Sequence, residues 1–239
     1  HDNAIVINTK KLNQIQFGPN NDTVKVQSGT TWEQIQIAAN DRGKSIIVKQ
    51  ASDIFSVGGS IGINCHGWAH EYGAIASTVE SLEIIDAEGD LRTLTPQDEL
   101  FGCMFGTLGY FGIIVSTTLK ITDNEYLHEK TTVVPLDAFI EEYKTKIKDN
   151  DIPLLGGRLT LDQLDGNPVR EVFMTRYERD KNSISSSANV KTTPFMAEPK
   201  YGTRFQRLAF NAVGHFPPAA ARKFISWFWS KEEEAMLSG

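Results

Sequence analysis

Residues 56–68 read SVGGSIGINCHGW, and this glycine-rich stretch decides what kind of fold the chain can adopt. Buried strands and surface helices are not composed in this way. Because glycine has no Cβ, the pair Gly58 and Gly59 lets backbone N–H groups converge on an anion or lie flat against a planar ring. Ser56 and Ser60 place hydroxyl groups on either side of the pair. The stretch therefore predicts a backbone that a ligand approaches closely.

A second glycine-rich segment, GCMFGTLGYFG at residues 102–112, precedes a run rich in Ile, Val and Thr. Two such segments far apart in the sequence predict two walls of one cofactor cleft. Neither contains the Lys-Ser/Thr ending of a phosphate-binding P-loop, and neither opens a βαβ unit as a dinucleotide fingerprint does. The alternative is structural, because glycines also mark tight turns and close packing of backbone.

Composition narrows the class of protein. The chain has 239 residues and a formal net charge of −6, which argues against a nucleic-acid partner because phosphate binding requires a basic face. Its two cysteines, Cys65 and Cys103, form no disulfide framework. No apolar run approaches the ~20 residues of a membrane-spanning helix. We expect a cytoplasmic or membrane-peripheral protein.

The first half of the chain mixes strands and helices without regular βαβ alternation, which predicts an α+β domain. Two overlapping capping boxes, Thr30 with Glu33 and Thr31 with Gln34, predict a helix that ends near Gly43. A second helix is expected to start at Thr95. Strands are expected at residues 4–7, 14–17, 24–27, 78–86, 91–94 and 111–121.

Beyond residue 122 the pattern predicts a second domain with a sheet layered by helices. Strands are expected at 126–134, 155–161 and 171–177, and a helix along 136–147 whose acidic residues come early and whose lysines come late. Residues 180–199 are expected to form a mobile loop. Residues 217–229 combine Phe and Trp with Arg and Lys, which predicts a core or domain-interface helix or, as the alternative, peripheral contact with a membrane.

Four motifs in fixed order resemble a known family. They are VKVQSGTTWEQIQIAANDRG, FSVGGSIGINCHG, VESLEIIDAEGDLRTLTP and DELFGCMFGTLGYFGIIVSTTLKIT, and together they span about residues 5–122. This order resembles the FAD-binding domain of the vanillyl-alcohol-oxidase family (PCMH type), nearest the branch of the aldonolactone oxidases and decaprenylphosphoryl-ribose oxidases. The resemblance implies an α+β chain with the second FAD subdomain at 1–122 and the beginning of an α+β cap domain at 123–239. It also implies that the family's N-terminal pyrophosphate-loop segment is missing here.

The resemblance assigns site residues by position. Those expected along the pyrophosphate and ribityl chain of FAD are Ala51, Ser52, Ser56, Gly58, Gly59 and Ser60. Those expected beside the chain and toward the isoalloxazine ring are Cys65, His66 and Gly67. Gly109 and Ile114 would close from the other wall, and Trp68 would lie near the substrate pocket. FAD is expected to be bound non-covalently by this stretch, because no residue matches a flavin-linking His or Cys.

The implied function is oxidation of an alcohol carbon in a sugar, aldonolactone or hydroxy acid, with hydride transfer to flavin N5 and reoxidation by dioxygen or another electron acceptor. No catalytic base is assigned; a structural hydrogen bond is the favoured role of His66. Two alternatives remain open. One is a non-catalytic flavin-fold module that binds a partner. The other is a metal-dependent enzyme using His66 and His70, for which the sequence offers no third ligand.

Overall fold

The computed structural model describes residues 6–159 and 171–179. Within them the chain forms two compact units, residues 6–125 and residues 126–179, each described here by itself. The expected turn at residues 165–168, the loop at 180–199 and the helix at 217–229 lie outside the described residues.

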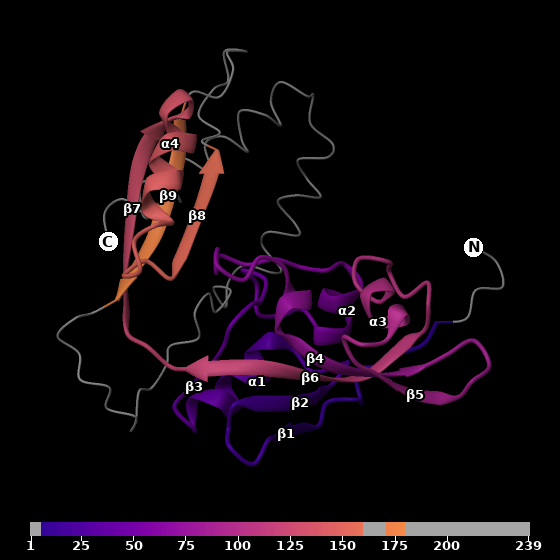
Figure 1. Ribbon diagram of the computed structural model, residues 1–239. Coiled ribbons are helices and arrows are strands. Elements are labelled where there is room, and N and C mark those ends of the chain that lie inside the picture. The colour runs from indigo at the N-terminus through magenta and orange to yellow at the C-terminus, as the bar shows by residue number, and fades with distance from the viewer. Residues whose placement is uncertain (1–5, 160–170, 180–239) are drawn as a thin grey trace, which may run out of the picture. The chain divides into compact units, whose positions relative to one another are not determined.

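The first unit is built on an antiparallel sheet with the strand order β1-β2-β6-β4-β5 (Figure 1). The 11-residue strand β6 is its centre, because it pairs with β2 on one side and with β4 on the other. The last residues of β6 also pair with β3. The strands are β1 (Ile15–Phe17), β2 (Thr23–Gln27), β3 (Lys44–Ile46), β4 (Val79–Ile85), β5 (Leu91–Leu94) and β6 (Ile113–Asp123). Sheet and helices together confirm the predicted α+β class.

One face of this sheet carries the core. Side chains that alternate along β2, β4 and β6 point to the same side and are buried. Trp32, Ile35 and Ala39 of helix α1 (Trp32–Asn40) are buried as well. The sheet residues of this core include Val24, Val26, Leu82, Ile84 and Leu119. Three shorter helices complete the unit: α2 (Val57–Gly62), the 3₁₀ turn η1 (Ile75–Thr78) and α3 (Glu99–Cys103).

The opposite face of the sheet carries a polar network across three strands. Glu83 of β4 lies between Lys25 of β2, whose Nζ is 2.6 Å from its carboxylate, and Ser116 of β6, whose hydroxyl donates to it at 2.5 Å. These hydrogen bonds, from Lys25 foremost, hold the pKa of Glu83 below its ordinary value. The network ties β2, β6 and β4 together on the side away from the core.

The start of α1 resolves the overlap between the two predicted capping boxes. Thr31 is the N-cap: its hydroxyl accepts from the Gln34 N–H at 3.4 Å, and the Gln34 amide accepts from the Thr31 N–H at 3.0 Å. The pair Thr30–Glu33 forms no such box, because the Thr30 N–H donates to the Gln27 carbonyl and the Glu33 N–H to the Asp53 carbonyl, both at 3.0 Å. A tertiary contact therefore decides between two equivalent sequence patterns.

The second unit has a three-stranded antiparallel sheet in the order β7-β9-β8, covered on one face by α4 (Figure 1). Its elements are β7 (Leu127–Pro135), α4 (Leu136–Lys146), β8 (Leu154–Leu159) and β9 (Glu171–Arg179). The small core consists of Val134, Ile152, Leu155 and Met174, with Phe139 and Tyr143 of α4 packed against it. Other apolar side chains of α4 stay outside this core, and Ile140 is 56% exposed.

Two sequence-based expectations about elements are wrong, and one strand was missed. Of the strand expected at residues 4–7, Val6 and Ile7 lie in no strand and are exposed, and Ala4 and Ile5 lie outside the described residues. The helix expected to start at Thr95 begins at Glu99 instead, because Asp98 accepts from both the N–H and the hydroxyl of Thr95 and closes a turn. Strand β3 was not predicted; its pairing with β6 offsets its short, mixed composition.

Gly157 of β8 supplies a test of the second unit. A Cβ built there would lie 2.6 Å from Cζ of Phe139, so the ring of α4 packs directly on bare backbone. We expect Gly157→Val to reduce the free energy of unfolding of this unit by about 1–3 kcal/mol through overpacking. Urea unfolding measures the effect. Gly102→Ala is the control, because a Cβ at exposed Gly102 meets nothing within 4 Å; equal losses for both variants would contradict the packing assignment.

Candidate cofactor site

The first turn of α2 is where the sequence predicts ligand contact, and most of its N–H groups are already used. The Val57 N–H donates to the Thr30 carbonyl and the Gly58 N–H to the Ser28 carbonyl, both at 2.9 Å. The N–H of Ser60 donates to the Ser56 carbonyl at 3.0 Å. Within the described residues, the N–H of Gly59 alone in this turn has no acceptor. The turn therefore offers an anion one backbone donor rather than several.

The glycines of this stretch divide into two kinds. A Cβ at Gly58 would lie 2.7 Å from Cβ of Ser28, and one at Gly67 would lie 2.3 Å from the carbonyl oxygen of Lys49. These two glycines are required by the packing of the protein on itself. A Cβ at Gly59 would meet only Oγ of Ser56, at 3.3 Å. The bare surface at Gly59 is therefore open to a ligand.

Ser56 completes a small polar corner with Gly59. It is the N-cap residue of α2, yet its side chain makes no capping hydrogen bond. The Ser56 hydroxyl thus lies next to the exposed Gly59 backbone, with both groups unused by the described part of the chain. A hydroxyl and an N–H at a helix start suit a phosphate oxygen, since both can donate to it.

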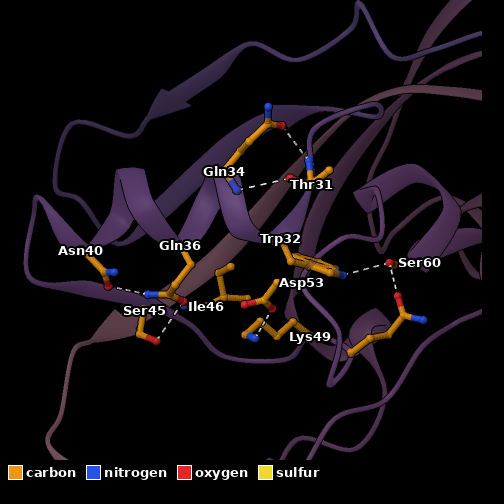
Figure 2. A network of polar contacts seen from close by, with 11 residues as sticks. Thr31, Trp32, Gln34, Gln36, Asn40, Ser45, Ile46, Lys49, Asp53 and Ser60 are labelled. Carbon is orange, nitrogen blue, oxygen red and sulfur yellow. Dashed lines mark hydrogen bonds and ion pairs between the residues drawn. The ribbon is translucent and has the colours of Figure 1, made fainter. Parts of the chain in front are cut away.

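The Ser60 hydroxyl, by contrast, is occupied by the protein. It accepts from the indole N–H of Trp32 at 3.0 Å. Two acceptors lie within hydrogen-bond distance of its single proton, the Gln50 amide oxygen at 2.5 Å and the Ser56 carbonyl oxygen at 2.9 Å. Figure 2 shows Trp32 and Ser60 joined in this way beneath α1. Ser60 is 1% exposed, so in this structure it ties α1, α2 and the preceding loop together.

Two buried hydroxyls lie under the same turn of α2. Ser28 and Thr30 are 3% and 0% exposed, and in the described part of the chain their side-chain oxygens have no hydrogen-bond partner. Leaving such groups unsatisfied costs about 1–3 kcal/mol each. Their backbone carbonyls hold the first turn of α2. Sequence reasoning missed both residues, because they belong to the end of β2 and to the segment before α1.

Ala51 and Ser52 lie on the loop of residues 47–56 between β3 and α2. Ala51 is exposed and Ser52 half-buried, so both can be reached from outside. The returning limb of this loop docks on the start of α1, where the Asp53 carbonyl accepts the Glu33 N–H at 3.0 Å and the Phe55 carbonyl accepts the Trp32 N–H at 3.2 Å. The loop is consequently held at a helix start although it has no regular structure of its own.

Cys65 follows α2 and is buried. Burial raises the pKa of its thiol from 9.0 to about 11; hydrogen bonding to the Ser60 side chain and the Gln50 backbone opposes this shift but is the smaller effect. The side chain is therefore a neutral thiol at physiological pH. It carries no thiolate that could attack or ligate.

His66 and Trp68 flank Gly67 on the chain after Cys65. His66 is exposed, and its Nδ1 lies 3.5 Å from the Gly67 carbonyl oxygen, while its backbone bridges to Ala74. Trp68 is half-buried. His70, the other half of the alternative metal site, is also half-buried, and no cluster of three or more His, Cys, Asp or Glu side chains occurs within residues 6–159 and 171–179.

The second glycine-rich segment meets the first at the end of α2. The N–H of Leu108 donates to the Gly62 carbonyl at 2.9 Å and that of Gly106 to the Ile61 carbonyl at 3.3 Å. Gly109 follows in this exposed loop with φ of +81°, which favours glycine. Ile114 is different: it lies within β6 opposite Ile84 and is only 8% exposed. The two predicted walls are therefore joined directly.

The comparisons with known proteins bear on the same region. Residues 1–95 match the family model described as FAD binding domain. This match supports FAD as the cofactor, as predicted from the motifs. The polar corner at Ser56 and Gly59 fits a phosphate oxygen of such a group.

The most informative relatives are oxidoreductases. The chain is 32% identical over 127 residues to decaprenylphosphoryl-β-D-ribose oxidase of Mycolicibacterium smegmatis, covering 51% of this chain and 28% of the relative. It is 27% identical over 145 residues to D-arabinono-1,4-lactone oxidase of Yarrowia lipolytica, covering 58% and 28%. An uncharacterized oxidoreductase from the fasciation locus of Rhodococcoides fascians is 23% identical over 219 residues, covering 87% and 50%.

These matches confirm the predicted resemblance to FAD-linked oxidoreductases near the aldonolactone and decaprenylphosphoryl-ribose oxidases. The chain spans between about a quarter and a half of the length of these relatives. The described part of the chain contains no helix both long and apolar enough to cross a membrane.

The contrast between Gly58 and Gly59 gives a direct test of the site. We expect Gly59→Val to leave the unfolding temperature of the apoprotein unchanged but to remove bound FAD, because the new side chain fills the open corner beside Ser56. Gly58→Ala, the matched variant, should lose about 1–3 kcal/mol of stability through its clash with Ser28. Flavin absorbance per mole of full-length protein and thermal unfolding measure the two effects. Unchanged flavin content in Gly59→Val would remove this residue from the site.

The raised pKa of Cys65 predicts selective alkylation. Below about pH 11 the Cys65 thiol stays protonated, and only the thiolate reacts with iodoacetamide. At pH 8 we therefore expect modification of exposed Cys103 and protection of Cys65, read from the peptide masses of the folded protein. Denatured protein is the control and should be modified at both positions. Rapid alkylation of Cys65 in the folded state would contradict its assignment as a neutral buried thiol.

Proposed function

We propose that the chain is part of an FAD-dependent oxidoreductase that oxidises an alcohol carbon of a small-molecule substrate to a carbonyl. The observation that carries the proposal is the polar corner of Ser56 and Gly59 within the region that matches the FAD-binding domain. When bound, FAD would supply the electron acceptor: its N5 would take the hydride from the substrate carbon, and the hydroxyl proton would pass to solvent. Dioxygen or another acceptor would then remove the two electrons.

In this proposal the Ser56 hydroxyl and the Gly59 N–H donate to one phosphate oxygen of the pyrophosphate. Ala51 and Ser52 present loop backbone along the same chain of the cofactor. Ser60 acts indirectly, because its hydroxyl is already engaged by Trp32 and Gln50. Its contribution is to fix α2, and with it the orientation of the Gly59 N–H.

Toward the ring, the proposed wall consists of Cys65, His66 and Gly67. Gly67 lies against the Lys49 carbonyl, so the backbone here is fixed rather than free to move toward a ligand. The neutral Cys65 thiol adds no charge beside a flavin, which leaves exposed His66 as the group able to donate a hydrogen bond there. Gly109 and Ile114 belong to the facing segment, with Gly109 the more accessible of the two.

The proposed substrate class is a sugar, an aldonolactone or a hydroxy acid. Its support is the similarity to relatives named decaprenylphosphoryl-β-D-ribose oxidase and D-arabinono-1,4-lactone oxidase. Both names describe oxidation of a carbohydrate derivative. Trp68 remains the candidate residue near the substrate, since an aromatic face packs well against a sugar ring.

Reduction of the bound flavin by substrate tests the proposal. We expect the full-length protein to purify with a flavin spectrum that bleaches under anaerobic addition of an aldonolactone, a pentose derivative or a hydroxy acid, and that returns on admission of air. Stopped-flow absorbance follows both half-reactions. A full-length protein that is colourless and takes up no added FAD would overturn the proposal. One that binds FAD but is bleached by none of these alcohols, while dithionite bleaches it, would support the non-catalytic alternative.

A further inference from the structure

The loop of residues 47–56 carries three of the proposed cofactor contacts, Ala51, Ser52 and Ser56, and a largely buried ion pair joins two of its residues. Lys49 and Asp53 form a salt bridge across four residues of irregular backbone, with side chains 19% and 9% exposed. Figure 2 shows this pair beside Trp32 and Ser60, within the same group of polar contacts. Between its two members lie only Gln50, Ala51 and Ser52.

Each end of this short turn is anchored separately. At the start of the turn, the carbonyl oxygen of Lys49 lies against Gly67, since a Cβ at Gly67 would be 2.3 Å from that oxygen. On the returning side, the Asp53 carbonyl accepts the Glu33 N–H of α1 at 3.0 Å. The ion pair joins these two anchor points directly. The distance between the Lys49 and Asp53 side chains consequently sets how far residues 50–52 extend from the rest of the first unit.

The middle of the turn is tied to α2 as well. The Gln50 amide oxygen accepts from the Ser60 hydroxyl at 2.5 Å, and Ser60 lies one residue after Gly59. A displacement of the turn therefore moves Ala51 and Ser52 and also pulls on the helix that presents the Gly59 N–H.

We propose that Lys49 and Asp53 are positioning residues for cofactor binding: their buried ion pair holds the turn of Gln50, Ala51 and Ser52 in the shape that meets FAD. The proposal rests on the proposed function, because it takes the cofactor to bind along this loop. Neither side chain touches FAD in this account. The pair acts only through the backbone between its members and through the Gln50–Ser60 hydrogen bond.

A positioning role differs measurably from simple charge balance. Removing one member of a buried pair leaves the other charge uncompensated, which destabilises any fold, whereas replacing both with apolar residues restores stability. If the pair serves charge balance alone, the double replacement restores FAD affinity together with stability. If the pair shapes the turn, the double replacement restores stability but not affinity.

The test compares Lys49→Met, Asp53→Asn and the double variant Lys49→Met with Asp53→Leu in the full-length protein. FAD is titrated into each apoprotein, its dissociation constant is taken from quenching of flavin fluorescence, and thermal unfolding of the apoprotein is measured in parallel. We expect both single variants to unfold at lower temperature. The double variant should unfold near the wild-type temperature and still bind FAD about tenfold more weakly, a loss of ~1.4 kcal/mol.

The matched control is the ion pair of Lys25 and Glu83, 2.6 Å apart on the other face of the sheet. Lys25→Met with Glu83→Gln should leave the FAD dissociation constant unchanged. A wild-type dissociation constant in the Lys49–Asp53 double variant would overturn the positioning role even where the single variants fail to fold. Wild-type protein that binds no FAD would instead overturn the proposed function itself, so the two failures are distinguishable.

Discussion

The close approach of α2 to the end of β2 is the constraint on which the candidate site depends. At Gly58 the helix backbone comes so near Ser28 that no Cβ fits, and the Gly58 N–H donates to the Ser28 carbonyl. This contact fixes the rotation of α2 about its axis. Once the rotation is set, Gly59 must face outward and Ser60 must face inward toward Trp32.

Adjacent residues of α2, Gly58, Gly59 and Ser60, consequently have different roles. One glycine exists for the protein's own packing and the next leaves a surface for a ligand, while the serine after them is enclosed by protein partners. A glycine-rich motif is often read as a uniform cradle of N–H groups. Here the protein uses the N–H groups of Val57 and Gly58 to attach the helix, and the surface left for an anion is correspondingly small and directional.

The sequence was sufficient to predict an element where the signal for it lies in neighbouring residues. The hairpin of β4 and β5 and the helix α1 follow from periodicity and turn residues. It was insufficient where geometry depends on distant partners: Thr30 and Thr31 have equivalent capping patterns, and the hydrogen bond from the Glu33 N–H to the distant Asp53 carbonyl excludes the first of them. The same limit hides the pair of Lys49 and Asp53, because spacing of four residues carries no meaning outside a helix, and no local pattern distinguishes Gly58 from Gly59.

The docking of loop 47–56 on α1 has a consequence for local unfolding. The amide protons of Trp32 and Glu33 are covered by carbonyls of that loop and not by α1 itself, so solvent reaches them only when the loop lifts away. Lifting it also removes the acceptors from the first turn of α1, which makes loop opening and helix fraying a single cooperative event. Hydrogen exchange at two amides of a helix thus reports the free energy that keeps a neighbouring, irregular segment closed.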